Sequence, residues 1–142
     1  VSYSRGGPDP YEAMFDGKVP KKSADRSLPH FTTYCFGGAE HGKLHWVRRN
    51  FDAETTVSSC EVFWYDESRP PGDVRLPKWW RVLYLDGKNW KPVENPSGYG
   101  IEPDKFNVMT FTSVKTQALR LEVQCQDTPH RYAMGIYEWR IK

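Results

Sequence analysis

The sequence has no apolar run that approaches the roughly 20 residues of a membrane-spanning helix, so no such span is expected. It also has no GxSxG, HExxH, Walker-type or GxGxxG motif, and its four histidines lack the spacing of a metal-binding pair on a helix. These absences predict a domain that is not an enzyme. The net charge of +2 is too small to indicate a nucleic-acid-binding protein. We therefore expect no nucleic acid and no membrane among its partners.

Cysteine is scarce, with three residues and no CxxC spacing. An odd number without such spacing indicates neither a disulfide framework nor a zinc site. Cys60 and Cys125 alternate with apolar neighbours, which predicts that both are small buried side chains. Cys35 lies in a loop-like stretch and is the one cysteine for which we expect exposure.

Aromatic residues are abundant, at 15% of the chain. Alternating apolar residues from Val82 run into Asp86-Gly87 and resume at Trp90. Since Asp-Gly tolerates positive φ, this block predicts a β-hairpin. We expect Trp90 to cover one end of the core.

Short apolar segments of this kind recur along the chain, separated by Gly, Pro, Asn and Asp. They predict strands at 45–51, 57–65, 80–85, 90–93, 106–111, 118–126 and 134–141. This spacing predicts an all-β protein, an antiparallel β-sandwich or barrel. Residues 1–30 have little apolar periodicity and are interpreted as an extended arm, with one short helical turn, that packs on a sandwich formed by 31–142. We expect the two parts to make one domain.

Arg49 breaks the pattern of its own strand. If Val47 and Phe51 face the core, a period of two places Arg49 there as well. An isolated buried charge is costly. Either Arg49 reaches an edge and keeps its guanidinium in water, or it has a buried acidic partner.

Loop residues combine rings with Arg and His, a combination that can bind sugars by stacking and by hydrogen bonds to hydroxyls. The candidate carbohydrate-binding residues are Tyr34, His41, Arg75, Trp79, His130 and Arg131. The alternative is that aromatic residues near strand ends cap the sandwich. That alternative is favoured for the tryptophans in or beside strands, at positions 46, 64, 80, 90 and 139.

A metal site is a further hypothesis. Asp16, in the arm, and Glu138, on the last strand, could hold one structural Ca²⁺ together with backbone carbonyls, which would fix the arm. In the alternative, Asp16 begins a turn and Glu138 pairs with an arginine.

Several blocks together resemble the discoidin or coagulation factor 5/8 type C superfamily, the galactose-binding-like jelly rolls that include family 32 carbohydrate-binding modules. The resemblance rests on the stretches 13–17, 46–62, 76–90 and 118–139, in that order. Nearly the whole chain is also similar to the C-terminal sandwich of bacterial glycoside hydrolases, particularly the β-L-arabinofuranosidase-like enzymes of gut Bacteroides.

The resemblance implies a jelly-roll β-sandwich with a ligand site on the loops at one end. It also implies a calcium ion near Asp16-Gly17 that Glu138 approaches. The implied function is a non-catalytic accessory module that binds glycan beside the catalytic domain of the same chain, in a periplasmic or extracellular enzyme. A full His/Arg/Asn sugar-binding set does not match. This leaves open a structural domain that packs on the catalytic domain without binding sugar. A protein- or membrane-binding discoidin domain ranks third, because it needs exposed apolar loop residues and only Trp79 and Phe36 are candidates.

Overall fold

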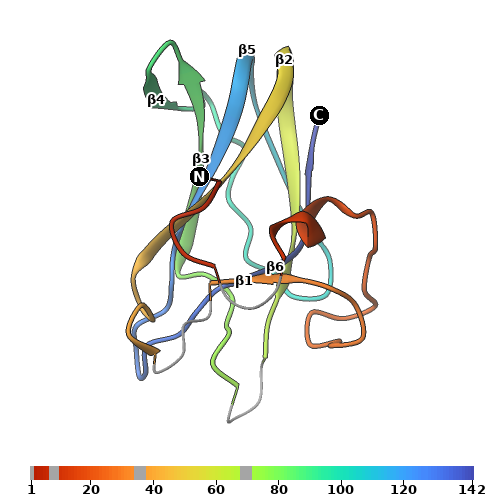
Figure 1. Ribbon diagram of the computed structural model, residues 1–142, viewed down its shortest axis with the longest axis vertical. Coiled ribbons are helices and arrows are strands. Elements are labelled where there is room, and N and C mark those ends of the chain that lie inside the picture. Colours follow the sequence, from red (N-terminus) through yellow and green to blue (C-terminus); the bar gives the residue numbers. More distant parts are fainter. Residues whose placement is uncertain (1, 7–9, 34–37, 68–71) are drawn as a thin grey trace.

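The computed structural model describes residues 2–6, 10–33, 38–67 and 72–142. Within them lie one short 3₁₀ helix and six strands: η1 (Tyr11–Phe15), β1 (Phe31–Thr32), β2 (Leu44–Tyr65), β3 (Trp79–Asp86), β4 (Asn89–Pro92), β5 (Phe106–Gln124) and β6 (Gly135–Ile141). The strands pair antiparallel in the order β1-β6-β2-β5-β3-β4 (Figure 1). The predicted all-β class is confirmed. No helix in the described ranges is long and apolar enough to cross a bilayer.

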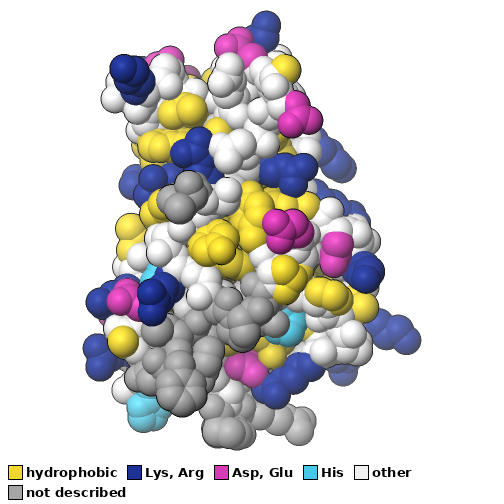
Figure 2. All heavy atoms as spheres, in the orientation of Figure 1, with side chains coloured by type: hydrophobic (Ala, Val, Ile, Leu, Met, Phe, Trp, Pro, Cys, Tyr) yellow, Lys and Arg dark blue, Asp and Glu magenta, His cyan; other side chains and the backbone are white. Residues whose placement is uncertain are grey.

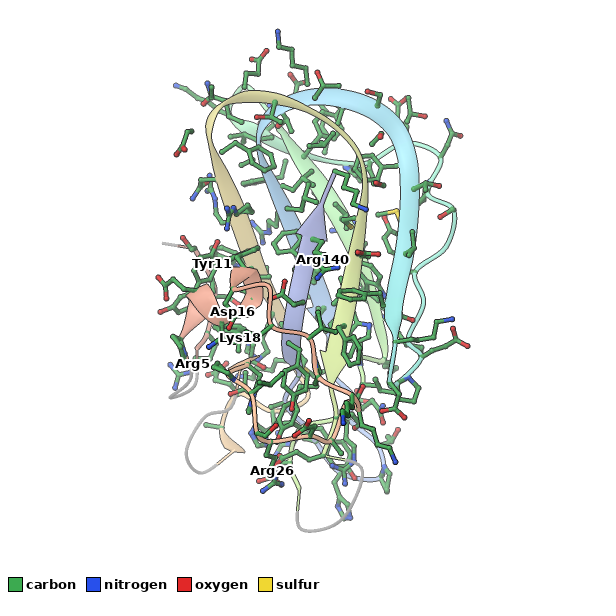
Figure 3. The ribbon with its side chains drawn as sticks, turned by 90° about the vertical axis from the view of Figure 1, so that its right-hand side faces the viewer. Arg5, Tyr11, Asp16, Lys18, Arg26 and Arg140 are labelled. Carbon is green, nitrogen blue, oxygen red and sulfur yellow. The ribbon has the colours of Figure 1, made fainter. Side chains whose placement is uncertain are left out.

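β2 and β5 are long strands that bend over one end of the molecule, as Figure 3 shows. The first half of β2 pairs with the second half of β5, and the second half of β2 pairs with the first half of β5 and with β6. The β2–β5 register shifts between Asn50 and Thr55 and again between Val57 and Ser59. One hydrogen-bonded sheet therefore folds over itself into the two layers of a sandwich.

The space between the layers is filled by apolar side chains from both halves of the long strands. Trp64, Trp80 and Trp139 are buried there, as predicted, and so are Cys60 and Cys125. The indole N–H groups of Trp64 and Trp80 both donate to the Gly100 carbonyl, at 3.3 and 2.9 Å. The indole N–H groups of these two side chains are thus paired, whereas the Trp139 Nε1 has no hydrogen-bond partner in the described ranges.

Two of the five tryptophans expected to cap the sandwich do not lie in the core, which corrects the prediction for Trp90 and Trp46. Tyr84 packs against the core, so its neighbour Leu85 and the cross-strand partner Trp90 face outward. The guanidinium of Arg120 lies 4.4 Å from the Trp46 ring and 5.8 Å from the Trp90 ring. Both rings are half-exposed and stack on arginine instead of covering the core.

The N-terminal residues lie along one edge of the sandwich. Ser4 donates its N–H to the Trp46 carbonyl at 2.9 Å, and the Ser2 carbonyl accepts from the Arg48 N–H at 2.8 Å. Farther along, η1 confirms the predicted helical turn, and its Phe15 ring lies 5.9 Å from the ring of Trp139.

The position of Arg49 is also settled. Its side chain is half-exposed, and its guanidinium lies 4.1 Å over the Phe15 ring. Within the described residues, no carboxylate is within 4 Å of it. Arg49 therefore reaches the edge of the sandwich, the first of the two alternatives.

Candidate functional site

Three loops that are distant in the sequence meet at the lower end of the molecule in Figure 1. Gly42 donates its N–H to the Tyr132 carbonyl at 2.8 Å, and Ala133 donates to Asp73 at 2.8 Å. Cys125 donates its N–H to the Lys43 carbonyl at 3.1 Å. We call this region, residues 38–43, 72–78 and 125–133, the loop end. The backbone bonds fix the loops relative to one another and so hold their side chains in place.

Arg75, a predicted sugar-binding residue, lies at the loop end but its guanidinium is already engaged. Its Nη1 donates to the carbonyls of Glu67, Gly72 (2.7 Å) and Val74 (3.1 Å). The guanidinium also lies 4.8 Å from the Tyr132 ring. Arg75 therefore holds the loop around it in shape.

His41, His130 and Arg131 are brought together with Arg75. Gly42 has a φ of +77°, and a Cβ there would lie 2.8 Å from the Arg131 Cγ. The absence of a side chain at Gly42 lets the stem of Arg131 pass directly over the backbone. His130 and Arg131 are exposed, and His41 is buried. Tyr34 lies outside the described residues.

Trp79 is the first residue of β3 and lies on the outer face of the sheet. It is 45% exposed, and its cross-strand partner is Gln124, which in turn pairs with the 44% exposed Leu44. Next to it, Lys78 and Asp127 form an ion pair at 3.3 Å. Trp79 therefore borders the loop end from the sheet face.

A polar hollow of about 480 Å³ was not anticipated from the sequence. Its walls are Lys22, Ser23, Ala24, Arg26, Asp66, Glu67 and Asp104, and Figure 3 shows Arg26 at the same end of the molecule as the loop end. Ser23 and Asp104 form a reciprocal pair: the Ser23 N–H donates to Asp104 Oδ1 at 2.7 Å, and the Asp104 N–H donates to Ser23 Oγ at 2.8 Å. The Asp66 N–H donates to the Ser23 carbonyl at 3.0 Å. The arm and two distant loops thus build one wall.

Asp66 is the least satisfied group of this hollow. It is 8% exposed, and its Oδ1 has no hydrogen-bond partner within the described part of the chain. Burial raises the pKa of Asp66, and the carboxylates of Asp104 and Glu67 raise it further, while Arg75 opposes them. Such an acceptor is available to a ligand hydroxyl. Arg26, which pairs with Glu67, supplies donors beside it.

The sequence offered one unused signal for this hollow. In the sequence, Asp66-Glu67 precedes a Pro-Pro-Gly turn, where acidic residues are usually exposed to solvent. However, Asp66 directly follows the apolar run that ends β2, and a carboxylate there is carried inside with the strand.

Asp16 and Glu138, the predicted metal ligands, face one another across η1 and β6. The Gly17 N–H donates to Glu138 Oε1 at 2.9 Å. Glu138 is 2% exposed, and burial, followed by its hydrogen bond with Asp16, raises its pKa to about 7. In the described ranges no third His, Cys, Asp or Glu joins them. Two facing carboxylates are hard oxygen donors of the kind Ca²⁺ prefers, with backbone carbonyls left to complete the shell.

Comparisons with known proteins bear on the fold. No protein-family model matches the sequence, and no curated protein sequence matches it significantly. Solved structures do match, each over 99% of this chain. The Streptococcus pneumoniae β-galactosidase BgaA matches with a TM-score of 0.81 at 18% identity over 89% of that chain. The family 32 module of Clostridium perfringens NanJ, in complex with galactose, matches with a TM-score of 0.71 at 14% identity over 90% of that chain. This chain has the fold of a family 32 carbohydrate-binding module.

A chitosan-binding module from a Paenibacillus chitosanase/glucanase has the same fold, with a TM-score of 0.65 at 18% identity over 92% of that chain. The family 32 fold is a galactose-binding-like, discoidin-like sandwich, so the resemblance identified from the motifs is confirmed at the level of architecture. Identities this low describe the backbone and do not assign a ligand.

Proposed function

We propose that this chain is a non-catalytic carbohydrate-binding module that binds glycan at the loop end. The observation that carries the proposal is the polar hollow beside the loop end, where Asp66 keeps a buried acceptor that has no partner among the described residues. The fold supports it, because the family 32 module of NanJ was solved with galactose.

The hollow suits a polyhydroxylated ligand. Asp66 and Asp104 accept hydrogen bonds from hydroxyls, and Lys22 and Arg26 donate to them. His130 and Arg131 lie in a loop that extends the site along a longer glycan, and Trp79 offers an exposed ring. Arg75 acts by holding the loop in place.

We further propose the setting that the resemblance implies. The module belongs to a secreted bacterial glycoside hydrolase of the Bacteroides type, in the periplasm or outside the cell. There it would keep the catalytic domain of the same chain close to its glycan. Reversible binding raises the effective concentration of substrate without any catalytic residue in the module.

A structural domain without sugar binding is the second candidate, and one surface favours it. The outer face of β2, β5, β3 and β4 presents the exposed Trp79 and the stacked Trp46, Arg120 and Trp90. Aromatic and arginine side chains are enriched at protein interfaces. In this candidate the catalytic domain covers that face.

The calcium proposal concerns stability. A Ca²⁺ ion held by Asp16 and Glu138 would tie η1 to β6 and compensate two facing carboxylates. Its role would be to fix the arm, with no part in sugar recognition.

A glycan array followed by calorimetry tests the binding function. We expect retention on at least one glycan, and Asp66→Asn and Arg26→Gln should each weaken binding by about tenfold, the usual effect of one charge-assisted hydrogen bond. Lys88→Gln, in the β3–β4 turn, is the matched control and should bind as the wild type does. No retention on any glycan would overturn the binding function and favour the structural domain.

A further inference from the structure

A second hollow, of about 410 Å³, lies on the side of the sandwich, away from the loop end. Its lining consists of Phe15, Gly17, Arg49, Phe51, Glu138, Trp139, Arg140, Ile141 and Lys142. We call it the lateral pocket. In Figure 3, Asp16 and Arg140 mark its side of the molecule, well above Arg26. It is therefore separate from the polar hollow.

The charges of the lateral pocket are unbalanced. Three cations, Arg49, Arg140 and Lys142, face one acid, Glu138. Glu138 is buried at the base, bonded to the Gly17 N–H and 3.9 Å from the Nε of Arg140. Arg49 and Lys142 have no ion pair among the described residues. Arg140 also pairs with Glu61 at 3.6 Å, and Asp16 adjoins Glu138, so the positive charge without an ion pair in this pocket is that of Arg49 and Lys142.

The walls of the pocket hold Arg49 in one orientation. Its guanidinium lies over the Phe15 ring, 4.1 Å from the ring centroid, and Phe15 is in turn packed against the rings of Tyr11 (5.3 Å) and Trp139 (5.9 Å). Stacking occupies the face of the guanidinium and leaves its N–H edge for another group. A planar fork of donors held in this way matches a carboxylate, which accepts two parallel hydrogen bonds.

A purely structural role does not explain why an arginine, and not an aliphatic residue, occupies position 49 of the strand. Val47, two residues earlier, is fully buried, and an aliphatic residue at position 49 would continue the core without a desolvation cost. The chain instead carries a cation beside Phe15 and Phe51. Figure 2 shows hydrophobic side chains gathered at the centre of this face, with Lys and Arg above them and acidic side chains beside them.

We propose that the lateral pocket binds a carboxylate-bearing sugar, a uronic acid residue. The carboxylate accepts two hydrogen bonds from Arg49, and Lys142 adds a second positive charge. The C–H face of the pyranose ring lies against Phe15 and Phe51. A ligand with one anionic edge and one apolar face fits this combination better than a neutral sugar or a small anion does. The proposal does not depend on glycan binding at the loop end.

Titration of the ¹⁵N-labelled chain with sodium D-glucuronate tests the proposal. D-Glucose serves as the matched neutral sugar and acetate as the anion without a ring. The buffer contains EDTA, because a carboxylate ligand could otherwise bind through calcium. We expect amide shifts confined to residues 15–17, 49–51 and 138–142, with glucose and acetate at least about tenfold weaker.

Two neighbouring arginines provide the matched variants. Arg49→Met keeps a long apolar stem and should lower the affinity for glucuronate about tenfold or more. Arg48→Met removes an equal charge from the outer face, where Arg48 lies over Trp90, and should leave the affinity unchanged. Asp66→Asn should also leave it unchanged.

Four outcomes would overturn the proposal: no shifts at the lateral pocket, equal binding of glucose or acetate, equal losses in Arg49→Met and Arg48→Met, or loss in Asp66→Asn. Tighter binding of poly-L-glutamate than of glucuronate would assign the pocket to an acidic peptide and overturn it as well. If Arg49→Met does not fold, the proposal is decided by the positions of the amide shifts in the wild type and by the affinity of Lys142→Gln for glucuronate.

Discussion

At the scale of single residues, the most consequential group is Glu138, a carboxylate buried beside a second carboxylate. Its pKa rises to about 7, from an ordinary value near 4.5. Without a cation, Glu138 in the folded chain is therefore mostly protonated below about pH 7. A calcium ion would need the ionised form, so protons and calcium compete for the same pair.

This competition predicts how stability depends on pH. A raised pKa in the folded state means that the contribution of protonated Glu138 is complete below about pH 4.5 and is lost as the pH rises through 7. In EDTA, the melting temperature of the wild type should fall more between pH 4.5 and 7.5 than that of Glu138→Gln, which cannot ionise. Calcium should raise the melting temperature of the wild type increasingly toward pH 7.5, and should not raise that of Glu138→Gln.

Asp66 also titrates at a raised pKa, so the informative quantity is the difference between the two proteins at each pH. Parallel curves for the wild type and Glu138→Gln in EDTA would show that Glu138 is not destabilised when ionised. A wild-type melting temperature unchanged by chelation at pH 7.5 would rule out the calcium ion.

These residues also show how far the sequence could predict the site. The alternation of side chains along the strand predicted that Arg49 lies on the same side as Val47 and Phe51. The family resemblance predicted that Asp16 lies near Glu138. The structure shows both arrangements. Asp66 could not be found in this way. Its burial depends on Ser23 and Asp104, which approach it only after the arm and a distant loop have packed.

At the scale of elements, strand positions were predictable and strand continuity was not. The segments 45–51 and 57–65 alternate correctly, but Asp52-Ala53-Glu54 between them has the composition of a turn. In the structure it stays extended and exposed, and β2 continues through it. Composition cannot separate a turn from a bend, because the strand is continued by pairing with β5 that resumes at Thr55, beyond the register shift.

In the β3–β4 hairpin, too, the sequence predicted the element but not its exact pairing. Asp86 pairs with Asn89, so the turn residues are Gly87 and Lys88, and Gly87 has a φ of +63°. Only the first of the two central residues has positive φ, the requirement of a type II′ turn. The hairpin was predicted correctly. Its turn is formed by Gly87 and Lys88, one residue farther along the chain than Asp86-Gly87, and this register places Trp90 on the outer face.

The bend in β5 is held by one buried hydroxyl. Thr116 Oγ1 accepts from the Leu85 N–H at 3.2 Å and is 2.8 Å from the Leu85 carbonyl oxygen, to which it can donate. β3 has run past the end of its pairing with β5 at this point, since the last paired residues are Tyr84 and Leu119. The hydroxyl therefore replaces a strand as the partner of the Leu85 backbone.

Thr116→Val should accordingly destabilise the fold. Valine has the same shape but leaves the part-buried Leu85 backbone groups unpaired, a loss of about 1–3 kcal/mol in the free energy of unfolding by urea. Thr112→Val is the matched control, because its hydroxyl accepts from the exposed Asn95 side chain at 2.9 Å, and it should cost less than about 1 kcal/mol. Equal losses in the two variants would show that Thr116 does not hold the bend.

At the scale of the whole molecule, the bent strands make one core out of two layers. Cys60 lies in the second half of β2, and Cys125 follows the end of β5, yet both belong to the same apolar cluster. Because β2 and β5 each run through both layers, local opening that exposes one half of the core also strains the other. The sandwich should therefore unfold as a single cooperative unit.

The two buried thiols can report on this cooperativity. Burial raises the pKa of Cys60 and of Cys125 to about 12, so the reactive thiolate is scarce in the folded chain. In a Cys35→Ser background, which leaves these two as the only thiols, native labelling by a disulfide reagent should be about 10³-fold or more slower than in urea. The two sites, resolved by peptide mass spectrometry, should react at equal rates, since each needs the same global opening. Faster labelling of Cys125 than of Cys60 would mean that the loop end opens independently, and a ligand bound there should then slow Cys125 alone.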